Sequence, residues 1–320
     1  MRRFLVTGGA GFIGSHITER LLKDGHSVVV LDNLSSGKEE NLSFTKNYTL
    51  NAIRYTLIKG DIRDSSTCQE ACRDIDAIFH QAALRSVPKS LDDPISFNEV
   101  NINGTLNMLE AAKKEKVKRF VFASSSSIYG ETDKFPQVET DSPRLISPYA
   151  LTKLAGEYYC RVYSENYNLS TVCLRYFNVF GPRQALDDEY AVVIPKFIHC
   201  LLNNQPYPVD GKGKQSRDFT YIDNVVEANI LAAVAPDIKW VVLNIANARD
   251  NSILGLVKAL NKIGEKNIQA VHHPPRQGDV FKTLADISQA KKLIGYQPQI
   301  DFKEGLARTV EWFKNKLGGK

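Results

Sequence analysis

The sequence contains few cysteines, and their placement excludes a dense disulfide framework. Five cysteines are scattered over 320 residues, and most lie in apolar or helix-like stretches. Small domains that depend on disulfides concentrate their cysteines far more densely. Cys68 and Cys72 share a helix face, but no His or Cys pair nearby completes a tetrahedral zinc set. We therefore expect reduced thiols and no bound metal.

Long apolar runs and a strong excess of one charge are also missing. No stretch approaches the roughly 18 unbroken apolar residues that a membrane helix needs. The first residues, MRRFLVTGG, run directly into an expected strand and a glycine turn, which leaves no room for a signal peptide. The net charge is +5, and the basic residues form no block suited to nucleic acid. We expect a cytoplasmic protein with a small anionic ligand and no nucleic acid or membrane partner.

The first half of the chain alternates short β-branched runs with longer segments of helical period. The expected strands are RFLVT, SVVVL, YTLIKGDI, AIFHQ, RFVFASS and STVCLRY. Such alternation is typical of a parallel sheet with crossover helices on both faces. The sequence therefore predicts an α/β fold with a Rossmann-type, doubly wound parallel sheet.

The second half is irregular and rich in turns. Stretches such as NNQPYPVDGKGKQ and VHHPPRQGD interrupt it, whereas YIDNVVEANILAAVA is typical of a helix that returns to the sheet. We expect a first domain at residues 1–178 with a returning segment near 218–248. Residues 179–217 and 249–320 are then a smaller, interleaved substrate-binding domain.

A glycine-rich turn follows the first expected strand. The segment VTGGAGFIGSH places Gly8, Gly11 and Gly14 between that strand and its helix. There the backbone must turn tightly and approach a pyrophosphate, which side chains would block. The phosphates would then lie at the helix N-terminus, where free N–H groups and the helix dipole stabilise them. This order of elements predicts a dinucleotide site.

Acidic residues at the ends of the next two strands refine that prediction. Asp32 ends the second strand, where a carboxylate accepts hydrogen bonds from the adenosine ribose and repels a 2′-phosphate. NAD is therefore favoured over NADP. Asp61 and Ile62 end the third strand and are candidates for contact with adenine; an ordinary strand-ending Asp is the alternative.

A candidate acid–base pair follows the fifth strand. The strand ends in ASSSSIYG, and SPYALTK then supplies Tyr149 and Lys153 at positions i and i+4 of an expected helix. A neighbouring ammonium stabilises phenolate, so we expect the pKa of Tyr149 to fall well below its reference of about 10. A serine of the strand end can hydrogen-bond the reacting hydroxyl. The YxxxK spacing alone is common on helices, but here it occurs with the glycine turn and the serine run.

With these motifs the chain resembles the extended short-chain dehydrogenase/reductases, and among them the UDP-hexose 4-epimerases, especially those that handle UDP-N-acetylglucosamine. The resemblance covers almost the whole chain, through TGGAGFIGSH, LDNLSSG, HQAALRSVPKS, NINGTLNMLEAAK, SSSSIYG, SPYALTK, LRYFNVFGPRQ, AVVIPKF, SRDFTYIDNV and RQGDVFKTLADISQAKKLIGYQP. It implies an NAD-dependent enzyme that inverts C4 of a UDP-sugar through a 4-keto intermediate. Relatives pair through two helices per subunit, so the helical stretches 94–116 and 149–163 imply a homodimer.

The resemblance also implies roles for individual residues. The catalytic residues are Ser125, Tyr149 and Lys153. Besides Tyr149 and Lys153, the cofactor contacts are Gly8, Gly11, Phe12, Ile13, Gly14, Asp32, Asn33, Ser36, Gly37, Asp61, Ile62, Gln81, Ala82, Ala83, Arg85 and Asn101. The substrate contacts are Ser86, Ser125, Ser127, Tyr149, Asn178, Val193, Arg217, Arg276, Asp279 and Thr283.

These substrate assignments are also chemically reasonable. Arg217 and Arg276, from separate loops, can clamp a pyrophosphate while Asp279 accepts from the uridine ribose. The alternative for each loop arginine is a surface salt bridge. Asn178 ends a strand beside the expected cleft, where its side-chain amide can reach a phosphate. Thr283 matches a position that borders the acetamido group in relatives, and its modest size favours UDP-GlcNAc and UDP-GalNAc, with UDP-glucose and UDP-galactose as further substrates.

Two classes of alternative remain. Nucleotide-sugar dehydratases and UDP-glucuronate decarboxylases share the fold, NAD, the Tyr and the Lys, but they place carboxylates just after the catalytic hydroxyl. The matching residues here are Ser126 and Ser127, which are poor acids near neutral pH. A non-catalytic protein that binds NAD and a sugar nucleotide for regulation is the other alternative. Such proteins generally lose the Tyr or the Lys, and both are present.

Overall fold

The computed structural model describes residues 1–48, 54–185, 192–275 and 280–318. At its centre is a seven-stranded sheet with the order β11-β6-β5-β4-β1-β2-β3, in which all neighbouring strands are parallel. The strands are β1 (Arg3–Thr7), β2 (Ser27–Asp32), β3 (Tyr55–Lys59), β4 (Ala77–His80), β5 (Arg119–Ser125), β6 (Ser170–Tyr176) and β11 (Trp240–Ile245). The predicted Rossmann-type, doubly wound sheet is confirmed.

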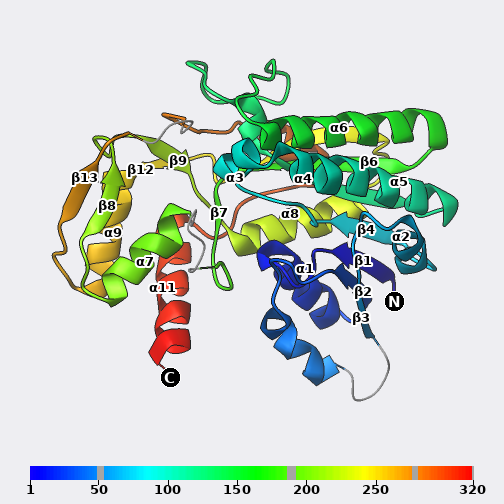
Figure 1. Ribbon diagram of the computed structural model, residues 1–320, viewed down its shortest axis with the longest axis horizontal. Helices are drawn as coiled ribbons and strands as arrows, with labels where there is room; N and C mark the ends of the chain where they lie inside the picture. The colour runs from blue at the N-terminus through cyan, green and yellow to red at the C-terminus, as the bar shows by residue number, and fades with distance from the viewer. Residues whose placement is uncertain (49–53, 186–191, 276–279, 319–320) are drawn as a thin grey trace.

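Helices cover both faces of this sheet (Figure 1). The helices α2 (Ser65–Ala71), α5 (Gly104–Lys114) and α6 (Pro148–Tyr167) pack on one face, and α1 (Phe12–Lys23) and α8 (Ile222–Val234) pack on the other. Successive strand residues alternate between the faces, so Leu5 enters one core cluster and Val6 the other. Both faces are buried, which explains why the strands are apolar throughout.

Local signals fix where α6, the helix that carries Tyr149 and Lys153, begins and ends. Ser147 caps α6 by accepting a hydrogen bond from the backbone N–H of Ala150 at 3.2 Å, and Pro148 occupies the first helical position. The helix ends at Tyr167, and its C-cap residue Asn168 adopts a left-handed conformation with φ of 56°. Tyr149 therefore lies in the first turn of α6, against the carboxyl end of β5.

A second helical stretch packs beside α6. It runs through α4 (Pro94–Asn98), a π-helical turn η2 (Glu99–Asn103) and α5, so the expected stretch 94–116 ends slightly earlier, at Lys114. The π turn buries Asn101. The other short helices are η1 (Glu39–Tyr48), α3 (Val87–Asp92) and η3 (Ser126–Tyr129).

The chain leaves the central sheet after β6 and returns to it at β11. Before the return it forms β7 (Val179–Phe180), α7 (Val193–Leu202), β8 (Tyr207–Asp210), β9 (Ser216–Asp218) and β10 (Thr220–Tyr221). After β11 it forms β12 (Asp250–Ser252), α9 (Ile253–Gly264), β13 (Ala270–His273), α10 (Ser288–Ile294) and α11 (Phe302–Gly318). Small sheets pair β12 with β9 and β13 with β8, so segments from both sides of β11 lie together, on the left in Figure 1. We refer to β7–β9 and the elements after β11 as the outer part.

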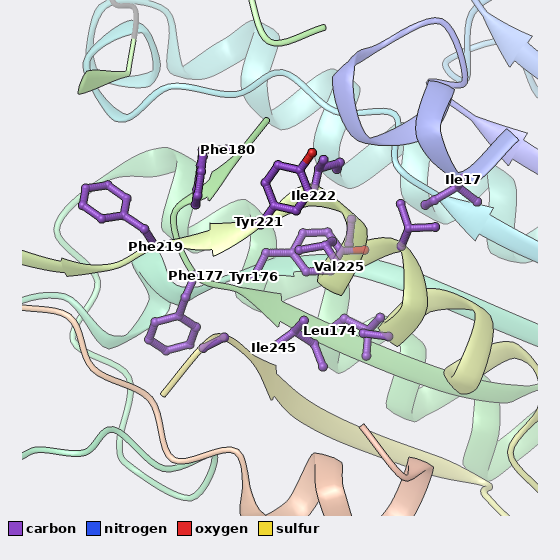
Figure 2. Packing of buried hydrophobic residues seen from close by; sticks show 14 of the residues in the cluster. Ile17, Leu174, Tyr176, Phe177, Phe180, Phe219, Tyr221, Ile222, Val225 and Ile245 are labelled. Carbon is purple, nitrogen blue, oxygen red and sulfur yellow. The ribbon is translucent and has the colours of Figure 1, made fainter. Parts of the chain in front are cut away.

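Aromatic side chains fill the junction between the outer part and the sheet. Figure 2 shows Phe180, Phe219 and Tyr221 beside residues of the central sheet and of α8. Phe180 meets Phe219 and Tyr221 edge to face, and Phe302 of α11 stacks on Phe219 with ring centroids 5.4 Å apart. All four rings are buried. Such packing holds the two halves of the molecule in a fixed relation.

The five cysteines are buried, free thiols. Among the described residues, no three His, Cys, Asp or Glu side chains gather as a metal site. No helix within these ranges combines the length and the apolar character that crossing a membrane requires.

Candidate active site

A cavity of about 1140 Å³ opens at the carboxyl ends of the central strands. It is lined by the glycine turn after β1, by the ends of β2 to β6 and by the first turn of α6. The outer part closes its other side with residues of α7, β9 and α11. Ligands of doubly wound folds bind at this edge of the sheet.

Most of the residues predicted from the sequence line this cavity. They are Gly8, Gly11, Phe12, Ile13, Gly14, Asp32, Asn33, Ser36, Gly37, Asp61, Ile62, Gln81, Ala82, Ala83, Arg85, Ser86, Ser125, Ser127, Tyr149, Lys153, Asn178, Val193, Arg217 and Thr283. Arg276 and Asp279 lie outside the described residues. Asn101 does not line the cavity: its side-chain amide bonds both backbone groups of Leu84 and the Thr152 hydroxyl instead.

The glycine turn brings three backbone segments together. Gly8 has a φ of +67°, and a Cβ there would stand 2.8 Å from the backbone nitrogen of Ala82. A Cβ on Gly14 would stand 2.2 Å from the carbonyl oxygen of Gly8. Only glycine allows these approaches, and Gly11, the N-cap residue of α1, provides no side-chain cap. The turn therefore lets a dinucleotide pyrophosphate approach the N-terminus of α1, whose first N–H groups have no side-chain cap.

The two acidic candidates differ in their surroundings. The Asp32 carboxylate is buried and accepts hydrogen bonds from the backbone N–H groups of Ala10 at 2.9 Å and Leu34 at 2.8 Å. Its remaining lone pairs can accept ribose hydroxyls. Asp61 binds the Arg63 guanidinium, whose hydrogen bonds lower the pKa of Asp61 to about 2.

The catalytic candidates meet at the wall of the cavity. The Tyr149 phenol and the Ser125 side chain line the same wall, where the first turn of α6 meets the end of β5, and the Ser125 hydroxyl oxygen accepts the backbone N–H of Ser127 at 3.1 Å. Lys153 lies one turn further along α6, and its ammonium donates to the carbonyl oxygen of Ala123 at 2.8 Å. The ammonium nitrogen is 5.9 Å from the centroid of the Tyr149 ring. Burial lowers the pKa of Lys153 to about 8.

The predicted lowering of the Tyr149 pKa is wrong in both sign and cause. Burial raises the pKa of Tyr149, because a phenolate loses its hydration there. Hydrogen bonding to the Ser125 side chain and the positive charge of Arg85 act in the opposite direction. The cation that favours phenolate is thus Arg85, from the loop after β4, while Lys153 is held by a backbone carbonyl.

A buried ion pair supports the strand ends below the catalytic residues. Glu157 of α6 receives two hydrogen bonds of 2.8 Å from the Arg175 guanidinium on β6. The same carboxylate accepts the Ser124 hydroxyl at 2.5 Å. Ser124 and Arg175 precede Ser125 and Tyr176 directly, so this network fixes β5, β6 and α6 around the cavity.

On the side of the cavity formed by the outer part, the Thr283 hydroxyl links Asn178, which follows β6, to Asp218 at the end of β9. The Thr283 hydroxyl oxygen accepts hydrogen bonds from the Asn178 amide at 2.9 Å and from the backbone N–H of Asp218 at 3.1 Å. Asn178 donates its second amide proton to the carbonyl oxygen of Asp218. Its amide therefore holds Thr283 at the cavity wall and binds the backbone of Asp218, and the phosphate contact expected of Asn178 stays a prediction.

Several cavity-lining residues escaped the sequence analysis. Arg183, after β7, and Phe313 and Lys316, in α11, line the cavity. The motif LRYFNVFGPRQ was a signal for Arg183, since it follows a strand end. No local pattern indicated α11, because only the fold brings this last helix to the cavity, where Lys316 pairs with Glu40 of η1. His80, buried at the end of β4, was also missed.

Comparisons with known proteins agree with this site. The model of the NAD dependent epimerase/dehydratase family matches residues 4–246. The chain therefore belongs to the NAD dependent epimerase/dehydratase family, and its cofactor is NAD.

Individual relatives cover almost the whole chain. A UDP-glucose 4-epimerase of Mycolicibacterium smegmatis is 38% identical over 98% of this chain and 99% of its own. A UDP-N-acetyl-alpha-D-glucosaminuronate decarboxylase of Bacillus cytotoxicus is 34% identical over 98% of both chains.

Two solved structures have the same architecture. The UDP-N-acetylglucosamine 4-epimerase of Methanobrevibacter ruminantium M1, in complex with UDP-N-acetylmuramic acid, superposes with a TM-score of 0.92 at 40% identity, covering 98% of this chain and 99% of that one. The UDP-glucuronic acid 4-epimerase of Bacillus cereus, with UDP-glucuronic acid and NAD, gives 0.89 at 34% identity and the same coverage.

Proposed function

We propose that this protein is a UDP-sugar 4-epimerase that prefers UDP-GlcNAc and UDP-GalNAc. The observation that carries the proposal is the placement of Ser125, Tyr149 and Lys153 on one wall of a single cavity, between the glycine turn and the outer part. A phenol in that place can remove the proton from a sugar hydroxyl. Three relatives at 34–40% identity are named as 4-epimerases of UDP-glucose, UDP-N-acetylglucosamine and UDP-glucuronic acid. Their names support the epimerase reaction more strongly than they support any one substrate.

The protein side of the reaction follows from the residues at the wall. Bound NAD supplies a hydride acceptor that later returns the hydride. Tyr149 takes the proton of the 4-hydroxyl and Ser125 orients that hydroxyl, so that C4 becomes a ketone. Arg85 stabilises the negative charge that develops on the phenol. When the sugar presents its other face, Tyr149 gives the proton back and C4 is inverted.

The preference for an N-acetylated sugar rests on Thr283. Thr283 lines the cavity, and its side chain is short. Its hydroxyl oxygen is held by Asn178 and Asp218, so the residue stays close to the wall and leaves space in front of it. An acetamido group would use that space. We also propose that Arg217, Arg276 and Asp279 hold the UDP moiety.

Dehydration and decarboxylation are the competing reactions. Both need an acid or base near C6, and the residues after Ser125 that line the cavity are Ser126 and Ser127. The Ser127 hydroxyl is buried and has no hydrogen-bond partner in the part of the chain that the structure describes. A serine hydroxyl is a weak acid, so the site favours epimerisation even though one relative carries a decarboxylase name.

We also propose that the protein is a homodimer and that each subunit has one domain for NAD and one domain for the sugar nucleotide. Residues 1–178 with 218–248 would bind NAD, and residues 179–217 with 249–320 would bind the sugar nucleotide. Exposed apolar side chains on α6 support a helical dimer interface.

A substrate panel tests the proposal. The purified protein is incubated separately with UDP-GlcNAc, UDP-glucose and UDP-glucuronic acid, and products are identified by proton NMR. We expect C4 epimers, fastest from UDP-GlcNAc, without lasting accumulation of free NADH. Release of carbon dioxide from the glucuronate, or a stable 4-keto-6-deoxy product, would replace the epimerase proposal by one of its competitors.

A further inference from the structure

A chain of buried hydrogen bonds passes through His80. Its Nδ1 atom lies 2.8 Å from the Thr7 hydroxyl, and its Nε2 atom lies 3.0 Å from the Thr105 hydroxyl. All three residues are at most 1% exposed. Thr7 and His80 are register partners on β1 and β4, so the sheet itself fixes the first of these contacts.

The other bonds of the two hydroxyls determine where the imidazole proton lies. Thr7 already accepts the backbone N–H of Ala82 at 3.2 Å, and Thr105 already donates to the carbonyl oxygen of Asn101 at 2.7 Å. Because Thr105 uses its one hydroxyl proton on Asn101, it must accept from Nε2. A neutral imidazole then has a bare Nδ1, to which Thr7 donates. Only a neutral imidazole with its proton on Nε2 satisfies all four bonds. Any form with a proton on Nδ1 leaves the buried Thr7 hydroxyl proton unpaired.

The electrostatic surroundings agree with the neutral form. Burial and the positive charge of Lys153 both lower the pKa of His80, to about 3. A second positive charge so close to Lys153 would be unfavourable. The imidazole is therefore a fixed donor and acceptor throughout the physiological range of pH.

The chain of bonds continues to the catalytic helix. In the π turn η2, the Asn101 amide donates to the Thr152 hydroxyl at 3.1 Å, and it exchanges two further hydrogen bonds with the backbone of Leu84. Thr152 in turn donates to the carbonyl oxygen of Tyr149 at 2.8 Å. The chain thus begins at the backbone of Ala82 and ends at the backbone of Tyr149.

We propose that this His80 relay, formed by Thr7, His80, Thr105, Asn101 and Thr152, positions the phenol against the cofactor side of the cavity. One end holds the loop of Ala82, which lies against the glycine turn, and the other holds the first turn of α6. His80, Thr105 and Thr152 are positioning residues, because they act through Ala82 and Tyr149. The predicted effect on kcat rests on the proposed epimerase function. The position of the proton on the His80 ring does not depend on that function.

Threonine variants test the kinetic consequence. Thr105→Val and Thr152→Val remove a relay hydroxyl at nearly constant shape, whereas Thr309→Val removes an equally buried hydroxyl in α11 that donates to the carbonyl oxygen of Gly305. We expect both relay variants to lower kcat by at least about tenfold with KM for UDP-GlcNAc almost unchanged. Thr152→Ser should restore most of kcat, and Thr309→Val should behave as wild type. Equal kcat in all three valine variants overturns the positioning role.

Imidazole nitrogen NMR tests the relay without turnover. In protein labelled with nitrogen-15 at histidine, the His80 ring should show a protonated Nε2 and a bare Nδ1 at neutral pH. Thr105→Val should shift these resonances and Thr309→Val should not. A proton on Nδ1 disproves the relay even in an active enzyme. If wild-type protein epimerises no UDP-sugar, the proposed function fails, and these spectra alone decide the relay.

Discussion

Tyr149 and Lys153 lie on one wall of the cavity, and the cation that opposes the effect of burial on the pKa of Tyr149 is Arg85, from a distant segment of the chain. The i, i+4 spacing and the preceding glycine turn were sufficient to place both residues on one cavity with Ser125. The direction of the Tyr149 pKa was not predictable, because it depends on burial and on Arg85, a residue 64 positions away in the chain. The hydrogen bonds of the Asn101 and Asn178 amides were not predictable for the same reason, because their partners are distant in the sequence.

Lys153 predicts a pH dependence of stability. Burial lowers its pKa from 10.5 to about 8, so folding is penalised below pH 8, where the side chain is charged. The penalty disappears as pH rises from 8 towards 10.5, because only the unfolded chain still binds the proton. Relative to Lys153→Met, wild-type protein should gain up to about 1.4 kcal/mol per pH unit in that window. Urea unfolding of both proteins between pH 7 and 10 measures this; a constant difference would contradict it.

Thr283 predicts substrate selectivity. Thr283→Tyr should lower kcat/KM for UDP-GlcNAc by about tenfold or more while sparing UDP-glucose, because the larger side chain fills the space of the acetamido group. Thr283→Val is the matched control, since it loses the bonds to Asn178 and Asp218 without added bulk. Equal losses for both sugars would remove Thr283 as the source of selectivity.

At the scale of elements, local patterns located the central strands and the catalytic helix. Ser147 and Pro148 are short-range signals for the start of a helix. They begin α6 directly before Tyr149, the residue that the sequence predicts to lie on a helix. The π turn at Glu99–Asn103 was not visible, because it is stabilised by tertiary contacts of Asn101. The small sheets of the outer part were not predictable either, since each pairs short segments that are distant in sequence.

The surface of α6 predicts an oligomer. Leu151, Tyr158 and Val162 are 53%, 57% and 46% exposed and follow one face of the helix. The double variant Tyr158→Lys, Val162→Lys should convert a dimer into monomers, because it places charge in an apolar interface. Val234→Lys, at a half-exposed site on the opposite side of the sheet, should leave the dimer intact. Light scattering measures both, and a monomeric wild type would reject the interface.

At the scale of the whole molecule, the cavity joins both halves of the chain, so ligand binding should stabilise them together. At a free NAD concentration of a hundred times Kd, we expect about 2.7 kcal/mol of added stability. NADP should give much less, because the Asp32 carboxylate repels its 2′-phosphate. Asp32→Asn should reduce the difference between the stabilisation by NAD and the stabilisation by NADP. Thermal unfolding with each nucleotide is the measurement, and equal stabilisation by NAD and NADP in wild type would contradict the role of Asp32.

The return of the chain at β11 has a consequence for biosynthesis. β11 pairs with β6, yet the whole of β7–β10 and α8 separates the two strands in the sequence. A nascent chain that has emerged only as far as β6 lacks both that edge strand and the helix α8 that covers α1. The edge of β6, with its unpaired backbone N–H and C=O groups, must stay open while the ribosome adds the intervening residues. That interval is when the growing polypeptide most needs a chaperone to prevent its association with other unfinished chains.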